Sequence, residues 1–176
     1  MRMTIVSTPA RSTSIRVAFR VAVMVVTLAV SRRADAQATS AADSTAVVAA
    51  VNRLFDGMAK RDTAAVRAVL MPGSQFISVR SGTESTARRQ ADSTFLRSLA
   101  GGGQRLLERM WTPMVYVHGA IAVLWAPYDF HIDGKFSHCG VDTFSLVRTA
   151  GGWQISGIAY TVEPTGCAAS PLGPPR

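Results

Sequence analysis

The chain has 176 residues, a length that suits one ordinary domain with a short extension. It contains 19 basic and 11 acidic residues, which gives a net charge of +8. The basic residues form no long run and no known nucleic-acid-binding motif, so we expect no nucleic acid as a partner.

Residues 1–36 have the layout of a secretory signal peptide. A basic leader precedes ten largely apolar residues, 21–30, and small residues allow cleavage after Ala36 or Ala38. The apolar run is shorter than the roughly 20 residues that cross a bilayer, although an uncleaved anchor is the alternative. Removal of residues 1–36, which hold six arginines and one aspartate, leaves a net charge of +3. We expect an exported protein, periplasmic or extracellular, that meets the membrane only through this segment, with a linker over 37–43.

Apolar periodicity in the first half of the chain predicts three helices and one short strand. Five apolar residues between 40 and 60 fall on one helical face: Val47, Val51, Leu54, Phe55 and Met58. Asp62 is a suitable N-cap for a second, short helix. A strand over 75–79 follows, and a third helix is expected over 86–99.

The second half has the alternation and turn signals of an antiparallel sheet. Strands are expected over 104–110, 114–126, 128–132, 135–147 and 153–162. Asp133-Gly134 favours a type I′ turn, and His118-Gly119 leaves open that 114–126 is itself a hairpin. Helices followed by a meandering sheet give an α+β domain over 44–163, with a flexible C-terminal tail over 164–176.

The hairpin around Asp133-Gly134 contains the most polar cluster in the chain. A two-residue turn there places Asp129 opposite His138. A carboxylate beside a histidine raises the histidine pKa and orients the ring, as a general acid/base pair requires. A solvent-exposed surface pair is the alternative. His131, His138 and Asp142 could donate to a metal, but their spacing matches no tight ligand motif, so we expect no metal and no other cofactor.

The two cysteines, Cys139 and Cys167, both follow the predicted cleavage site. An even number of cysteines in an exported protein favours a disulfide, and two separate thiols are the alternative. The hairpin at Gly151-Gly152 places Cys139 opposite roughly residue 163, about 13 Å of extended chain from Cys167. The bond therefore requires a turn over 163–166.

Four segments resemble the nuclear transport factor 2-like superfamily, and its SnoaL-like and lumazine-binding bacterial branch in particular. The segments are Gly57–Val66, Gly119–Tyr128, Asp133–Phe144 and Gly152–Ile155. The resemblance covers about residues 44–163. It implies a cone-shaped antiparallel sheet wrapped around the N-terminal helices, a pocket between them, and a homodimer formed through the sheet. Isomerase members carry a carboxylate base inside the pocket, and the strand over 75–79 has none.

We therefore expect an exported domain that binds a small hydrophobic or aromatic ligand in its cone pocket without catalysis. Eight residues are predicted to line the pocket: the apolar walls Trp111, Tyr116, Trp125, Tyr128 and Phe144, and the polar contacts Asp129, His131 and His138. One alternative is an isomerase or dehydratase in which Asp129 orients His138 as the acid/base. The other is a dimeric protein-interaction module.

Overall fold

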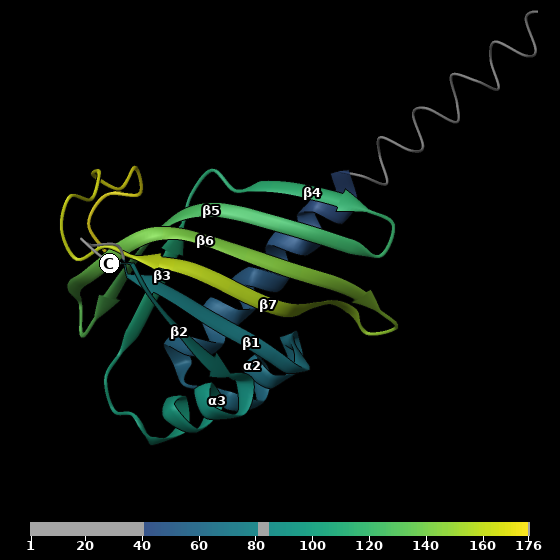
Figure 1. The fold of residues 1–176 in the computed structure, drawn as a ribbon, viewed down its shortest axis with the longest axis horizontal. Coiled ribbons are helices and arrows are strands. Elements are labelled where there is room, and N and C mark those ends of the chain that lie inside the picture. The colour runs from purple at the N-terminus through teal and green to yellow at the C-terminus, as the bar shows by residue number, and fades with distance from the viewer. Residues whose placement is uncertain (1–40, 81–84, 176) are drawn as a thin grey trace, which may run out of the picture. The chain divides into compact units, whose positions relative to one another are not determined.

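The computed structural model describes residues 41–80 and 85–175 (Figure 1). The predicted signal segment and both cleavage positions lie outside these residues, as does part of the 37–43 linker. Residues Ala42–Arg176 form one compact unit. No helix in the described part of the chain is long and apolar enough to cross a membrane.

The described residues form three helices. The predicted first helix is confirmed over 41–60. The second helix, α2 (Thr63–Val69), begins where Asp62 predicted it, since the Asp62 carboxylate accepts hydrogen bonds from the backbone N–H groups of Ala64 and Ala65 at 3.0 and 2.9 Å. The third helix, α3 (Asp92–Gly101), covers only the later part of the predicted range.

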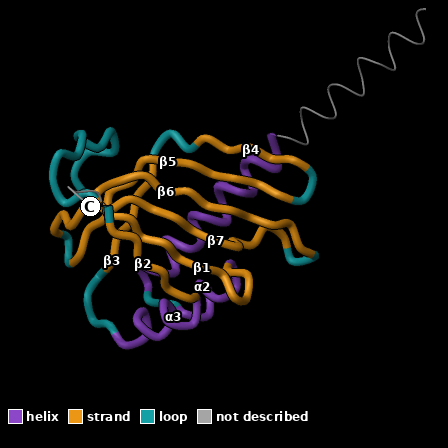
Figure 2. Tube along the Cα trace, in the orientation of Figure 1, coloured by secondary structure: helices purple, strands orange, loops and turns teal. Residues whose placement is uncertain are grey.

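Within the described residues, seven strands form one curved, unclosed sheet in the order β2-β1-β7-β6-β5-β3, with β4 pairing the other half of β5 (Figure 2). The strands are β1 (Leu70–Arg80), β2 (Thr86–Ala91), β3 (Leu106–Met110), β4 (Met114–His118), β5 (Ile121–Ile132), β6 (Lys135–Thr149) and β7 (Gly152–Val162). The first helix runs behind the sheet in both figures. This arrangement confirms the predicted α+β cone.

The hydrophobic core lies between the first helix, α2 and the concave face of the sheet. Its most deeply buried members come from both layers: Val47, Val51, Leu54 and Val66 from the helices, and Leu124, Phe144, Leu146 and Ile155 from the strands. Val47, Val51 and Leu54 recur at the spacing that brings one face of the first helix onto the sheet, and Val66 does the same for α2. Their burial holds the helices against β5, β6 and β7.

The predicted helix over 86–99 is wrong in its first half. Residues 86–91 form β2, which pairs antiparallel with β1 from Arg80↔Thr86 to Gln75↔Ala91. The open edge of β1 offers six residues of ladder pairing, and this tertiary contact overrides the local helical pattern. The helix then begins at Asp92, whose carboxylate accepts hydrogen bonds from the N–H groups of Ser93 and Gly73.

The segment 114–126 is a hairpin, the alternative that His118-Gly119 had left open. Gly119 adopts a φ of 58°, and β4 turns back onto β5 with His118 opposite Ile121 and Tyr116 opposite Val123. A two-residue turn changes which residues share a face. As a result Tyr116, Ile121 and Val123 all point outward and are exposed.

The hairpin between β5 and β6 turns where the sequence predicted it. Asp133 and Gly134 both have positive φ, and the pairs Ile132↔Lys135 and His131↔Phe136 flank them. The next pair is Phe130↔His138, so Ser137 is an extra residue that forms a β-bulge. Every later side chain of β6 therefore lies on the face opposite to the one that an unbroken ladder would give.

Cys139 and Cys167 form a disulfide with a Cα–Cα distance of 6.1 Å. Cys139 pairs with Glu163 as expected, and the predicted turn over 163–166 includes Gly166 at a φ of 79°. The bond is compatible with an oxidising, exported location. The C-terminal tail is attached at a second point, where Arg109 Nη1 donates to the Gly173 carbonyl at 3.0 Å.

Candidate functional site

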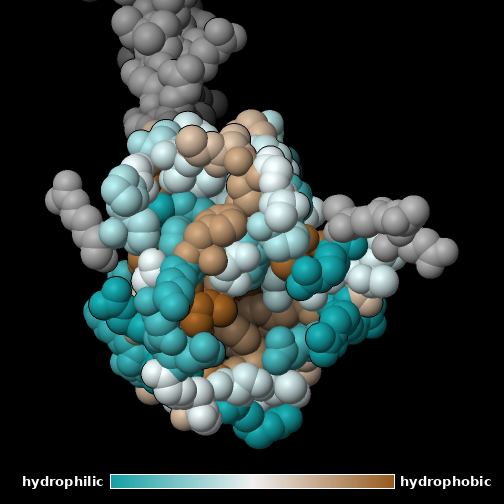
Figure 3. Space-filling model, turned by 90° about the vertical axis from the view of Figure 1, so that its left-hand side faces the viewer, coloured by the Kyte–Doolittle hydropathy of each residue, from teal (hydrophilic) through white to brown (hydrophobic). Residues whose placement is uncertain are grey.

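An apolar cavity of about 100 Å³ opens between the helices and the concave face of the sheet. Most of its lining is aromatic or aliphatic: Leu54, Phe55, Met58, Phe76, Phe95, Tyr128, Phe130, Phe144, Ile158 and Tyr160. The polar remainder is Glu108, His138 and Asp142. The face shown in Figure 3 is hollowed, with a hydrophobic floor and a largely hydrophilic rim. Such an apolar hollow with a few convergent polar groups has the character of a ligand site.

Two carboxyl groups face each other in this cavity. Glu108 comes from the middle of β3 and Asp142 from β6, and their side chains share a hydrogen bond. Burial raises the pKa of Glu108 to about 7, against the opposing effect of that hydrogen bond. Burial also raises the pKa of Asp142 well above its ordinary value, and the neighbouring Glu108 raises it further.

A shared proton explains how the two acids coexist. Asp142 is 1% exposed, and apart from the neighbouring Glu108 no described residue offers a hydrogen-bond donor to its Oδ2. Two ionised carboxylates could only repel each other, whereas one protonated group donates to the other. The raised pKa values of both carboxyl groups mean that the pair holds at least one proton near neutral pH.

Two tyrosines and one histidine surround the pair. The hydroxyl of Tyr128 donates to the Thr161 carbonyl at 2.6 Å, which fixes its ring in the wall. Tyr160 forms a side-chain hydrogen bond with Ser78, and burial raises its pKa. The His138 ring lies 5.0 Å from the Phe130 ring, and burial lowers the His138 pKa, as does the positive charge of Arg80. The imidazole is therefore biased toward its neutral form.

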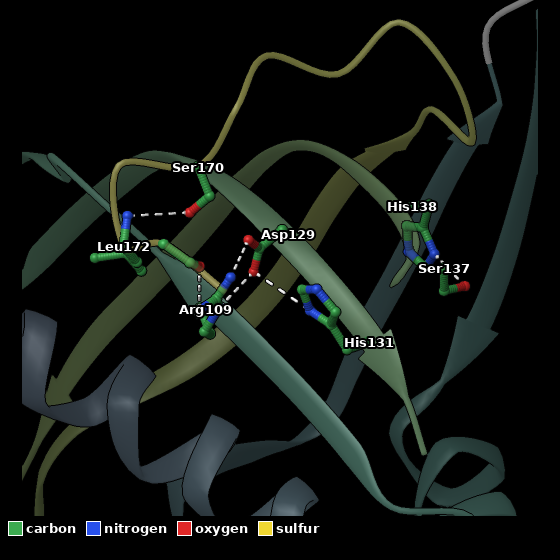
Figure 4. Close-up of polar contacts among 8 residues, drawn as sticks. Arg109, Asp129, His131, Ser137, His138, Ser170 and Leu172 are labelled. Carbon is green, nitrogen blue, oxygen red and sulfur yellow. Dashed lines mark hydrogen bonds and ion pairs between the residues drawn. The ribbon is translucent and has the colours of Figure 1, made fainter. Parts of the chain in front are cut away.

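A second polar cluster lies on the outer face of the sheet, beneath the C-terminal tail (Figure 4). Arg109 donates two hydrogen bonds to Asp129, from Nε to Oδ1 at 2.8 Å and from Nη2 to Oδ2 at 2.6 Å. His131 Nδ1 lies 3.6 Å from Asp129 Oδ1. The side chains of Asp129 and His131 are 7% and 6% exposed, so the cluster is a buried ion pair with a histidine beside it.

The predicted pairing of Asp129 with His138 is wrong. Asp129 lies opposite Cys139, and the bulge at Ser137 places His138 opposite Phe130 instead. Figure 4 shows His138 with Ser137 apart from the Arg109–Asp129–His131 cluster. Asp129 therefore serves Arg109 on the outer face, and His138 belongs to the cavity.

Comparison with known proteins identifies the fold. The structure matches a nuclear transport factor 2-like superfamily protein from Salmonella enterica serovar Typhimurium with a TM-score of 0.57 and 14% identity, covering 74% of this chain and 97% of that one. It also matches a proposed dehydratase of the NTF2-like family from Streptomyces avermitilis, with a TM-score of 0.55, 16% identity, and coverage of 69% and 96% respectively. The chain has the nuclear transport factor 2-like fold. No protein-family model and no curated protein matches it by sequence.

Three of the eight predicted pocket residues line the cavity, namely Tyr128, His138 and Phe144. The other five lie elsewhere. Tyr116 is 69% exposed on the outer face, and Trp125 points outward on the neighbouring strand. Trp111 follows β3 and donates its backbone N–H to Pro127, while Asp129 and His131 lie beneath the tail.

The prediction missed Glu108 altogether and considered Asp142 only as a metal donor. A signal for Glu108 was present, since it is a lone acid on the face of β3 that also carries Leu106 and Met110, both of which pack against the core. His131 lies on the outer face, so it does not join His138 and Asp142 as a metal set. Among the described residues no group of three or more donor side chains is placed to hold a metal ion.

Proposed function

We propose that this exported domain binds a small apolar or aromatic molecule that carries a hydroxyl or carbonyl group. The observation that supports the proposal is the Glu108–Asp142 pair at the wall of an aromatic cavity. The protonated carboxyl donates a hydrogen bond and the other accepts one, so the pair complements either polar group. The aromatic walls exclude water and bury the rest of the ligand.

Binding can be measured with N-phenyl-1-naphthylamine, a neutral aromatic probe whose fluorescence rises in apolar sites. The purified chain should bind it, and Ile158→Phe, which fills the cavity from β7, should abolish binding. Tyr116→Ser is the matched control, because it removes an exposed aromatic side chain from the outer face. Binding that survives Ile158→Phe but is lost in Tyr116→Ser would locate the probe on the surface and refute the proposal.

The role of the carboxyl pair has its own test. We expect 2-naphthol to displace the probe at lower concentration than naphthalene, because only the naphthol can hydrogen-bond the pair. Glu108→Leu should remove this preference while keeping probe binding. Equal displacement by the two compounds in the wild-type chain would contradict a polar contact at this position.

A proton-transfer enzyme is the second candidate, favoured by the pKa of Glu108 at about 7. An acid that titrates near neutral pH is well matched to giving and taking protons. In this scheme the protonated carboxyl hydrogen-bonds a substrate carbonyl while the carboxylate removes a proton from the adjacent carbon. Glu108 and Asp142 replace the predicted pairing of Asp129 and His138 as the acid/base groups, and His138 contributes as a neutral neighbour.

The test of this candidate is exchange of the α-protons of 2-tetralone in D2O, followed by NMR. Glu108→Gln and Asp142→Asn should each remove the acceleration over buffer, whereas Asp129→Asn should keep it in whatever fraction remains folded. A wild-type rate equal to the buffer rate would leave ligand binding as the function.

The predicted homodimer remains a proposal. Its support is an apolar strip on the outer face of the β4–β5 hairpin, formed by Met114, Tyr116, Ile121, Val123 and Trp125. Exposed apolar patches of this kind commonly form protein interfaces. Light scattering of Tyr116→Glu against the wild type would show whether the strip joins two copies.

A further inference from the structure

A basic recess adjoins the cavity on the concave side of the sheet. It has a volume of about 360 Å³ and lies between β1, β2, the end of β7 and the first turn of α3. Its lining is Phe76, Ser78, Arg88, Arg89, Gln90, Ala91, Thr94 and Tyr160. Phe76 and Tyr160 also line the cavity, so two aromatic rings form the common wall of the two spaces.

Strand register connects Arg88 directly to the carboxyl pair. Arg88 lies opposite Ser78, Ser78 opposite Tyr160, and Tyr160 opposite Asp142. Residues opposite each other in neighbouring strands point to the same face, so these four side chains form one row across the concave side. Three strand spacings separate the two ends, which makes the row about 14 Å long.

Positive charge gathers at the outer end of this row. Neither Arg80 nor Arg88 takes part in an ion pair among the described residues. Both charges nevertheless act on the site. The pKa of His138 is lowered first by burial and then by Arg80, and Arg88 opposes the burial-driven rise of the Tyr160 pKa. The outer end therefore favours an anion, while the inner end presents a carboxyl pair that donates and accepts hydrogen bonds.

The cavity alone is small for a ligand of ordinary size. Drug-sized ligand pockets usually measure about 300–1,000 Å³, whereas this cavity measures about 100 Å³. A ligand larger than a ring or two must extend beyond it, and the recess provides the adjoining space. We propose that the natural ligand is an amphipathic organic anion, whose apolar body fills the cavity and whose acidic group lies in the recess against Arg88. This inference rests on the proposed binding function and specifies its ligand class.

Two probes that differ by one acidic group test the proposal. N-phenyl-1-naphthylamine is neutral, and 8-anilino-1-naphthalenesulfonate adds a sulfonate to the same ring system. At low salt the purified chain should bind the sulfonate about fivefold to tenfold more tightly than the neutral probe. Arg88→Gln should remove this preference and leave affinity for the neutral probe within about twofold, with Arg88→Lys intermediate.

Arg67→Gln is the matched control. Arg67 is an exposed arginine at the end of α2 and belongs to the lining of neither space, so its loss changes the net charge equally without touching the recess. Equal affinities of the two probes, or equal losses in Arg88→Gln and Arg67→Gln, would overturn the anion site and leave the binding function standing. The second outcome would leave Arg88 with the role of a charged residue that protects a sheet edge. Binding of neither probe would overturn both proposals.

Discussion

Each face of the sheet buries one aspartate, and the two aspartates have partners of opposite charge type. Asp142 on the inner face is 1% exposed and meets another acid, Glu108. Asp129 on the outer face is 5% exposed and meets a bidentate Arg109. Glu108 and Arg109 are consecutive on β3, so strand alternation alone sends one to each face. Similar burial thus produces a shared proton on one side and an ion pair on the other.

The inner carboxyl pair is therefore suited to chemistry with a ligand, whereas the outer ion pair supports the fold. The inner pair has a proton to give and a lone pair to receive one, and it faces an open cavity. The outer carboxylate has both oxygens occupied by the guanidinium and lies beneath the C-terminal tail. We therefore expect the inner face to respond to ligands and pH and the outer face to respond to changes that alter stability.

The largest expected effect is a difference in the free energy of unfolding between two variants, in which the aspartate of each face is replaced by asparagine. Asp129→Asn leaves the largely buried guanidinium of Arg109 without its carboxylate counter-charge, and should lower the free energy of unfolding by about 3–5 kcal/mol. Asp142→Asn removes a like-charge conflict and keeps hydrogen-bonding capacity, so it should cost less than about 1 kcal/mol and become stabilising above pH 7. Urea unfolding at pH 8 measures both. Similar losses in the two variants would mean that the faces do not differ as described.

Removal of the disulfide should affect one face only. Cys139→Ser with Cys167→Ser opens a loop of 28 residues, and the chain-entropy relation gives a loss of about 3.5 kcal/mol. The tail then loses one of its two described attachments, which uncovers Arg109 and Asp129. Affinity for N-phenyl-1-naphthylamine should stay within about twofold of the wild-type value below the unfolding transition. A large loss of affinity would show that the tail also supports the cavity.

The sequence predicted the features that depend on local chemistry. The apolar spacing of the first helix, the Asp62 cap and the Asp133-Gly134 turn each follow from a few neighbouring residues. The disulfide was predicted from the even number of cysteines, and the Gly151-Gly152 hairpin correctly placed Cys139 opposite Glu163. Apart from the disulfide, each signal lies within one element or one turn.

The candidate site depended on features that are not local. One extra residue at Ser137 separated His138 from Asp129, with which it was predicted to pair, and no residue type in that segment indicates a bulge. The hairpin at Gly119 turned Tyr116 away from the cavity. Glu108 and Asp142 are 34 positions apart in the chain and meet only because β3 and β6 both flank β5. Long-range pairing of this kind requires the assembled sheet.

The last prediction concerns the pH dependence of stability. The Glu108 carboxyl has a pKa of about 7 in the fold and an ordinary value of 4.5. Between these values the folded state holds more protons than the unfolded state, so the free energy of unfolding falls as pH rises from about 4.5 to about 7. The fall should be at most about 3 kcal/mol. Glu108→Gln, which stays neutral, should flatten it and raise stability at pH 8.

His138 provides the opposing control for this slope. Its pKa is lowered in the fold, so protonation of the unfolded chain reduces stability as pH falls below about 6.5. The two groups therefore act in opposite directions between pH 5 and 7, and the wild-type curve contains both. In His138→Gln the descent due to Glu108 should become steeper, and in the double variant with Glu108→Gln both contributions should disappear. Urea unfolding of the four proteins at half-unit pH intervals separates them. A wild-type curve that Glu108→Gln leaves unchanged would mean that Glu108 ionises normally, and the inner carboxyl pair would then be no proton carrier.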